Sequence, residues 1–251
     1  MILTDNPIGN YRFLTGIAPY SSGVVAMPGY EIRHVTLRQP QPYRKGFELI
    51  ARHLADQDRP RQALCAVELR SPRPFTFEGF AEFNRGYQNI LTNWALLVEG
   101  QNPVARTNVA PEVNPPAEPA LFAFSYTVPQ DDSIVLPTFI VAGAGDLADG
   151  VLSPDAIVRP GETSIEAMRE KAAHVLGSMQ ARLAGLQATW PDVTSVDVYT
   201  IQPLQPILAD TILKVMGMAA GRGVNWFYSR PPIVGLEFEM DMRGVRQEIW
   251  L

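Results

Sequence analysis

Residues 225–251 read NWFYSRPPIVGLEFEMDMRGVRQEIWL, and this stretch decides the fold of the C-terminal end. Residues that favour β-structure dominate 233–240, and Arg243-Gly244 is typical of a turn. Residues 245–251 then return with a second strand-like pattern. The stretch therefore predicts a C-terminal β-hairpin.

Arg230 lies just before this hairpin, within the sequence YSRPP. A rigid strand scaffold can hold the planar guanidinium so that it binds a carboxylate by two parallel hydrogen bonds. Arg230 is therefore a candidate anion-binding residue. The alternative is an ordinary ion pair at the surface or at an interface, which contributes little to stability.

The segments that lead up to this stretch alternate between strand and helix patterns. Apolar and β-branched runs predict strands, whereas apolar residues at helical spacing predict amphipathic helices. In the second half we expect strands at 138–144 and 193–201, and helices at 165–186 and 207–220.

The first half follows a similar succession. A Pro-Tyr-Ser-Ser turn opens 17–29, and its short apolar strand is expected to form a hairpin with 30–37. Proline residues are frequent in 103–120, which we interpret as the edge of a sheet rather than a linker, because a strand follows at once. The other expected elements are helices at 43–56 and 77–97, and strands at 62–69 and 121–128.

Two pairs of segments suggest an internal repeat. ALCAVELRSPRP corresponds to SVDVYTIQPLQP, and NPVARTNV corresponds to NWFYSRPPIV. The chain is therefore predicted to be a tandem repeat of a β-β-α-β-α-β unit, with domains at 1–128 and 129–251. Each unit would form a mixed sheet with two helices on one face, an α+β architecture.

Composition narrows the class of protein. The 251 residues are 46% hydrophobic, enough for a sizeable core, and the net charge of −5 makes nucleic acid a poor partner. No apolar run approaches membrane-spanning length and no signal peptide pattern opens the chain, so we expect a cytoplasmic protein without a membrane partner. Cys65 lies in an apolar run as a buried thiol, and the scattered histidines His34, His53 and His174 predict no metal site.

Three segments carry a family resemblance. IAPYSSGV at residue 17, PVARTNV at residue 103 and the run 139–186 resemble the N-terminal turn, the PAR motif and the strand and long helix of the RidA/YjgF superfamily, also called endoribonuclease L-PSP-like. The resemblance covers nearly the whole chain, twice. It implies two tandem chorismate-mutase-like units.

The resemblance also implies an activity and a set of site residues. The superfamily binds the carboxylate of a small imine or enamine acid through the PAR arginine, and a glutamate on the last strand positions the attacking water without a cofactor. Carried over, Arg106 and Arg230 would bind the substrate carboxylate, Tyr20 and Ser21 would line the pocket, and Glu248 would be the catalytic residue. The expected reaction is hydrolytic deamination of a substrate such as 2-iminopropanoate or 2-aminomuconate.

Neither half contains the complete set of family residues. The strand LFAFSYTV of the first half has no carboxylate, and the second half has no Pro-Tyr-Ser turn. A complete site therefore needs groups from both halves. Because superfamily members are trimers with sites between subunits, the resemblance implies a homo-oligomer, with a trimer favoured.

Other interpretations remain open at this stage. Diverged repeats could keep an anion pocket without turnover, which would make this a carboxylate-binding or regulatory protein. Cleavage of RNA follows only from the family name, and the acidic net charge argues against it. Glu237 and Glu239 alternate along one strand and are expected on a solvated face, with Glu237 a second choice for the carboxylate.

Overall fold

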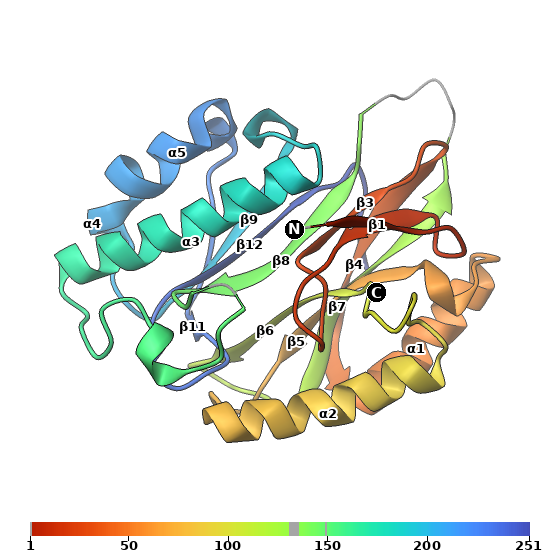
Figure 1. Cartoon of the computed structure of the whole chain (residues 1–251), viewed down its shortest axis with the longest axis horizontal. Coiled ribbons are helices and arrows are strands. Elements are labelled where there is room, and N and C mark those ends of the chain that lie inside the picture. The colour runs from red at the N-terminus through yellow and green to blue at the C-terminus, as the bar shows by residue number, and fades with distance from the viewer. Residues whose placement is uncertain (1, 131–135, 149) are drawn as a thin grey trace.

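The computed structural model describes residues 2–130, 136–148 and 150–251, and it contains two mixed β-sheets with helices on their outer faces (Figure 1). The α+β class predicted from the sequence is confirmed. No helix in the described ranges is long and apolar enough to cross a membrane.

The first sheet has six strands in the order β11-β6-β5-β7-β4-β13. Helices α1 and α2 cover its outer face and share a core with it, which includes Phe47, Ile50, Tyr87 and Phe124. The predicted helix 43–56 is confirmed at its exact bounds. The elements are β4 Tyr30–Pro42, α1 Tyr43–Asp56, β5 Leu64–Arg70, α2 Phe77–Asn93, β6 Ala105–Pro111, β7 Ala120–Pro129, β11 Ser229–Arg230 and β13 Glu248–Trp250, with a 3-10 turn at Arg61–Ala63.

The second sheet has seven strands in the order β1-β2-β3-β8-β12-β9-β10. Helix α3 packs on its outer face, and the Ser164 side chain caps its first turn by accepting the N–H of Ala167. The elements are β1 Leu3–Asn6, β2 Tyr11–Leu14, β3 Gly23–Ala26, β8 Phe139–Gly145, α3 Ile165–Gly185, β9 Ser195–Tyr199, β10 Asn225–Phe227 and β12 Glu239–Gly244, with 3-10 turns at Pro154–Ala156 and Trp190–Asp192.

The predicted helix at 207–220 is broken into short pieces. A turn of α-helix, α4 Gln205–Ile207, leads into a π-helical segment at Leu208–Leu213, then α5 Lys214–Met216 and a 3-10 segment at Gly217–Arg222. Gly217 has a φ of 57°, which ends the α-helical geometry there. The apolar residues of this segment still pack against α3.

Both hairpins predicted from the sequence are wrong. β12 pairs with β8 and β9, whereas β13 pairs in parallel with β4 in the other sheet. Similarly, β3 pairs with β2 and β8, and β4 pairs with β7. In each case the chain crosses from one sheet to the other at the expected turn.

The two sheets pack face to face between the helical layers (Figure 1). A cluster of small and aromatic side chains joins them, including Tyr11, Phe13, Ile32, Cys65 and Ala142. Burial raises the pKa of the Cys65 thiol, so this cysteine stays protonated and acts as an apolar side chain. The molecule thus has four layers, helix, sheet, sheet and helix.

Four strands of each sheet share one arrangement. The first sheet contains β6-β5-β7-β4 and the second contains β10-β9-β12-β8. In both, the first pair is parallel and the next two pairs are antiparallel. Segments also cross between the halves, since β1, β2 and β3 extend the second sheet, whereas β11 and β13 border the first.

Candidate active site

Arg106 lies on β6 with only 3% of its surface exposed. Four aromatic rings surround its guanidinium, at 4.7 Å for Tyr20, 4.8 Å for Tyr87, 5.5 Å for Phe80 and 5.7 Å for Phe83. Burial lowers the pKa of Arg106, but an arginine remains charged at any physiological pH. This cage holds a permanent positive charge in a buried site.

Among the described residues, only one of the two terminal nitrogens of the Arg106 guanidinium has a hydrogen-bond partner. Nη2 donates to Oδ1 of Asn84 on α2 at 2.7 Å, which fixes the orientation of the guanidinium. Nη1 is buried and has no hydrogen-bond partner among the described residues. A buried donor without a partner is costly, and such groups occur where a ligand completes the bond.

The N-terminal turn brings Tyr20 to Arg106. Ser21 is fully buried, its Oγ donates to the carbonyl of Pro103 at 2.9 Å, and its backbone N–H donates to Val104. Ser21 therefore ties the turn to the chain entering β6 and does not line the cavity described below. Of the two residues expected to line the pocket, Tyr20 lies beside Arg106, whereas Ser21 holds the turn in place.

Glu239 on β12 is a buried carboxyl group that lies near Arg106. It is 4% exposed, so the expectation of a solvated face for this residue is wrong. Burial raises its pKa to about 8, with the negative charge of Asp146 adding to the effect, while Arg182 and Arg106 lower the pKa. At neutral pH the carboxyl group therefore mostly holds its proton.

Backbone geometry holds Glu239 in place. An added Cβ on Gly143 would lie 2.3 Å from Glu239 Oε1, so this glycine leaves the space that the carboxyl group occupies. Oδ1 of Asp146 accepts the backbone N–H groups of Glu237 and Phe238 at 3.0 and 3.2 Å, and its Oδ2 accepts from Lys171 at 2.7 Å. The buried Asp146–Lys171 pair thus anchors the start of β12.

Arg106 and Glu239 line the same small cavity of about 60 Å³. A larger cavity of about 270 Å³ adjoins it, since both share Tyr20, Gly143, Gly145, Leu147 and Leu152. We refer to them as the narrow arm and the wide arm. Their walls come from both halves of the chain. Arg182 of α3 lines the wide arm and donates to the carbonyls of Ala142 and Gly143.

Arg230 and Glu248 lie elsewhere in the fold. Arg230 on β11 pairs with Glu112 at 2.6 Å, and each side chain is 37% exposed. This contact holds the pKa of Glu112 below its usual range. Glu248 on β13 pairs with Arg243 at 2.7 Å. Neither residue lines the two arms, so the geometry corresponds to the ion-pair alternative for Arg230 and brings a different glutamate to Arg106.

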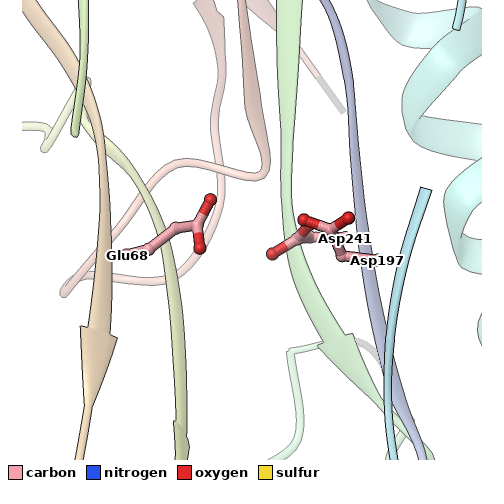
Figure 2. Close-up of side chains that lie close together, drawn as sticks. All are labelled: Glu68, Asp197 and Asp241. Atoms are coloured by element: carbon pink, nitrogen blue, oxygen red, sulfur yellow. The ribbon is translucent and has the colours of Figure 1, made fainter. Parts of the chain in front are cut away.

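A second buried polar cluster lies between the sheets, where Glu68 points toward Asp197 and Asp241 (Figure 2). One carboxylate oxygen from each lies within 4.8 Å of the others. Arg70 pairs with Glu68 at 3.2 Å, Arg243 pairs with Asp197 at 2.7 Å, and Tyr199 donates to Asp241 at 3.1 Å. Burial and the two neighbouring carboxylates raise the pKa of Asp241, while Arg70 and Arg243 form ion pairs with the other two carboxyl groups.

His34 lies beside this cluster. Burial, assisted by the charge of Arg243, lowers the pKa of His34 to about 3. The imidazole is therefore neutral at neutral pH, and its 3.6 Å approach to Glu68 is not an ion pair. The cluster joins the two sheets through these ion pairs and hydrogen bonds.

Comparison with known proteins identifies the family. A family model described as 2-aminomuconate deaminase CnbZ matches residues 3–249. A 2-amino-5-chloromuconate deaminase from Comamonas testosteroni is 41% identical over 242 residues, which cover 96% of this chain and 95% of the relative. The chain belongs to the 2-aminomuconate deaminase CnbZ family. The matched residues include strands of both sheets and every residue that lines the two arms.

Solved structures show weaker similarity. A chorismatase is 12% identical and has a TM-score of 0.48, with 89% of this chain and 77% of that chain covered. A YjgF/YER057c/UK114 family member from Mycobacterium tuberculosis is 13% identical and has a TM-score of 0.30, with 43% and 79% covered. Similarities at these TM-scores are too weak to establish a shared function.

Gly143 offers a test of how closely the site is built around Glu239. Gly143→Ala is expected to displace the carboxyl group and to lower the catalytic activity of the site by at least about 10-fold, because small errors in position are costly in catalysis. Stability should change little, since the clashing atom is the end of a flexible side chain. Thermal unfolding and ammonia release measure the two effects. Equal activity in the variant would contradict the assigned position of Glu239.

Proposed function

We propose that this protein catalyses the hydrolytic deamination of a 2-aminomuconate-type substrate, an enamine that carries two carboxylates. The observation that carries the proposal is that Arg106 and Glu239, a fixed cation and a mostly protonated carboxylic acid, line one narrow cavity. Family membership supports the reaction class.

The two arms suit the two parts of such a substrate. The narrow arm has room for about two waters at roughly 30 Å³ each, a volume similar to one carboxylate group. Arg106 would bind the carboxylate beside the amine-bearing carbon, because its free Nη1 faces no other partner among the described residues. The wide arm would hold the remaining carbon chain and the distal carboxylate, with Tyr20 forming the wall between the arms.

Glu239 would carry each proton transfer of the reaction in turn. In its acid form it donates a proton to the enamine carbon, which turns the C–N bond into an imine. The resulting carboxylate then accepts a proton from water as the oxygen attacks the imine carbon. The carboxyl group then passes this proton to the nitrogen, and as the C–N bond breaks the carboxylate takes the proton of the hydroxyl group, which becomes the carbonyl. Ammonia leaves and Glu239 regains its acid form, so that enamine and water give a 2-oxo acid and ammonia. A pKa near neutrality suits a group that must act as acid and then as base.

The direct test is ammonia release from 2-aminomuconate generated in situ. Wild-type protein should release ammonia in step with loss of the enamine absorbance. Arg230→Ala and Glu248→Gln serve as controls and should stay within twofold of wild type, because their side chains form ion pairs outside both arms. Binding without ammonia release would instead support a carboxylate-binding protein.

We also propose that the chain is a tandem repeat that assembles into a homo-oligomer, with a trimer favoured. The shared strand order of β6-β5-β7-β4 and β10-β9-β12-β8 supports the repeat. Exposed aromatic side chains near the sheet edges, Trp226, Tyr228 and Trp250, support further association. Light scattering measures the assembly state.

A further inference from the structure

Asn108 is a second buried donor that faces the narrow arm. It lies two residues after Arg106 on β6, and alternate residues of a strand project from the same face. Its side chain is 3% exposed and lines the same cavity as Arg106 and Glu239. Its amide Nδ2 has no hydrogen-bond partner among the described residues.

Ser71 sets the orientation of this amide. The Ser71 hydroxyl donates to Oδ1 of Asn108 at 2.9 Å, and the backbone N–H of Ser71 donates to the carbonyl of Val109. Because Oδ1 accepts from Ser71, the orientation of the amide is set, and among the described residues nothing accepts a hydrogen bond from Nδ2. Two adjacent donors, Asn108 Nδ2 and Arg106 Nη1, therefore both lack partners at the same place.

We propose that Asn108 and Arg106 together bind one carboxylate of the substrate, with Arg106 supplying the charge and the Asn108 amide supplying a directional neutral donor. The inference rests on the proposed function for the identity of the ligand. A carboxylate presents two oxygens in one plane, which matches two donors on one strand face. A neutral second donor adds a hydrogen bond without a further buried charge, whose desolvation would be costly.

The arrangement also gives a reason for selectivity. An ester or an amide at this place has one good acceptor oxygen and no negative charge, so one of the two buried donors is left unpaired, and such mismatches reduce binding strongly. Asn108 would thus act as a specificity-determining residue, and Ser71 as a positioning residue that acts through it.

The test uses cis,cis-muconate, a dicarboxylate without the amine, so that binding is measured without turnover. Calorimetry should give an affinity about 10-fold lower for Asn108→Ala, the loss of one hydrogen bond to a charged group. Asn108→Asp should bind at least about 100-fold more weakly, because a second carboxylate repels the ligand. Ser71→Ala should fall between wild type and Asn108→Ala. With the amine-bearing substrate, KM should rise while kcat changes less.

Asn6→Ala is the matched control, since Asn6, the last residue of β1, is equally buried but accepts the backbone N–H of Gly9 and lies outside both arms. It should bind muconate as wild type does. Wild-type affinity in Asn108→Ala, or tight binding by Asn108→Asp, would overturn the proposal, as would a wild-type protein that does not bind muconate. Absence of ammonia release from a wild-type protein that binds muconate would contradict the deaminase function and leave the Asn108 assignment intact.

Discussion

Replacing Glu239 with glutamine is expected to lower kcat for deamination by about 10²–10⁴-fold, the usual contribution of a positioned acid–base group. Glutamine keeps the shape of the side chain against Gly143 but cannot exchange a proton. Muconate affinity should remain within a few-fold of wild type, because Arg106 still supplies the charge. Single-turnover ammonia release measures the effect, and activity within threefold of wild type would remove Glu239 from the mechanism.

The pH dependence checks the same assignment independently. Because the pKa of Glu239 is raised to about 8, the acid form that starts the reaction is lost above that pH. The value of kcat/KM for the wild type should therefore decline about 10-fold per pH unit above pH 8. A profile that stays flat to pH 10 would show that another group supplies the proton.

Glu239→Gln should raise the free energy of unfolding near pH 8 although it lowers activity. The folded state holds a proton on Glu239 that the unfolded chain releases above its ordinary pKa of 4.5, so stability falls as pH rises between 4.5 and about 8. Glu239→Gln removes this cost. The variant should unfold at the same temperature as wild type near pH 4, and be more stable by on the order of 3 kcal/mol near pH 8. Thermal scans at the two pH values make the comparison.

Arg106→Ala is expected to have the second large effect, a loss in kcat/KM on the order of 10³-fold, since charged hydrogen bonds to a buried carboxylate contribute several kcal/mol together. Arg106→Lys should recover little of this activity. A lysine cannot donate to Asn84 and to the substrate in one plane, nor stack flat within the aromatic cage. Steady-state kinetics and muconate titration measure both variants.

Arg230→Ala is the matched arginine control, because Arg230 keeps its guanidinium on the surface in a pair with Glu112. Its kinetics should match wild type, and its stability should change by less than about 1 kcal/mol. A comparable loss of activity in both arginine variants would mean that Arg230 reaches the substrate in an assembly of several chains. Wild-type kinetics in Arg106→Ala would contradict the carboxylate site itself.

Local patterns in the sequence were sufficient for much of the scaffold. The apolar spacing of 43–56 predicts α1 at its exact bounds, because one buried stripe on a helix is a property of that segment alone. The motif around Arg106 and the turn that holds Tyr20 could also be found, since both are short segments with unusual composition. Their contact at 4.7 Å agrees with a site built around this arginine.

The partner of Arg106 could not be found in this way. Phe238, just before β12, packs in the core beneath α3 together with Met240 and Met242 of the strand, whereas Glu239 and Asp241 face the other sheet. The alternating sequence LEFEMDM is the same whether its polar face meets water or a second sheet. The exposed end of the chain, with Glu248 on β13, was therefore the more natural candidate for the catalytic carboxylate.

The sequence by itself determined three of the four expected helices, most strands, the α+β class and the arginine at the centre of the site. The tertiary structure alone decided which strands pair, because 225–251 divides between two sheets and pairs with strands far away in the chain. The same packing covers Glu239, raises its pKa and brings it to Arg106. Periodicity records that one face of a strand is polar, but what covers that face depends on contacts between distant segments, which no local pattern contains.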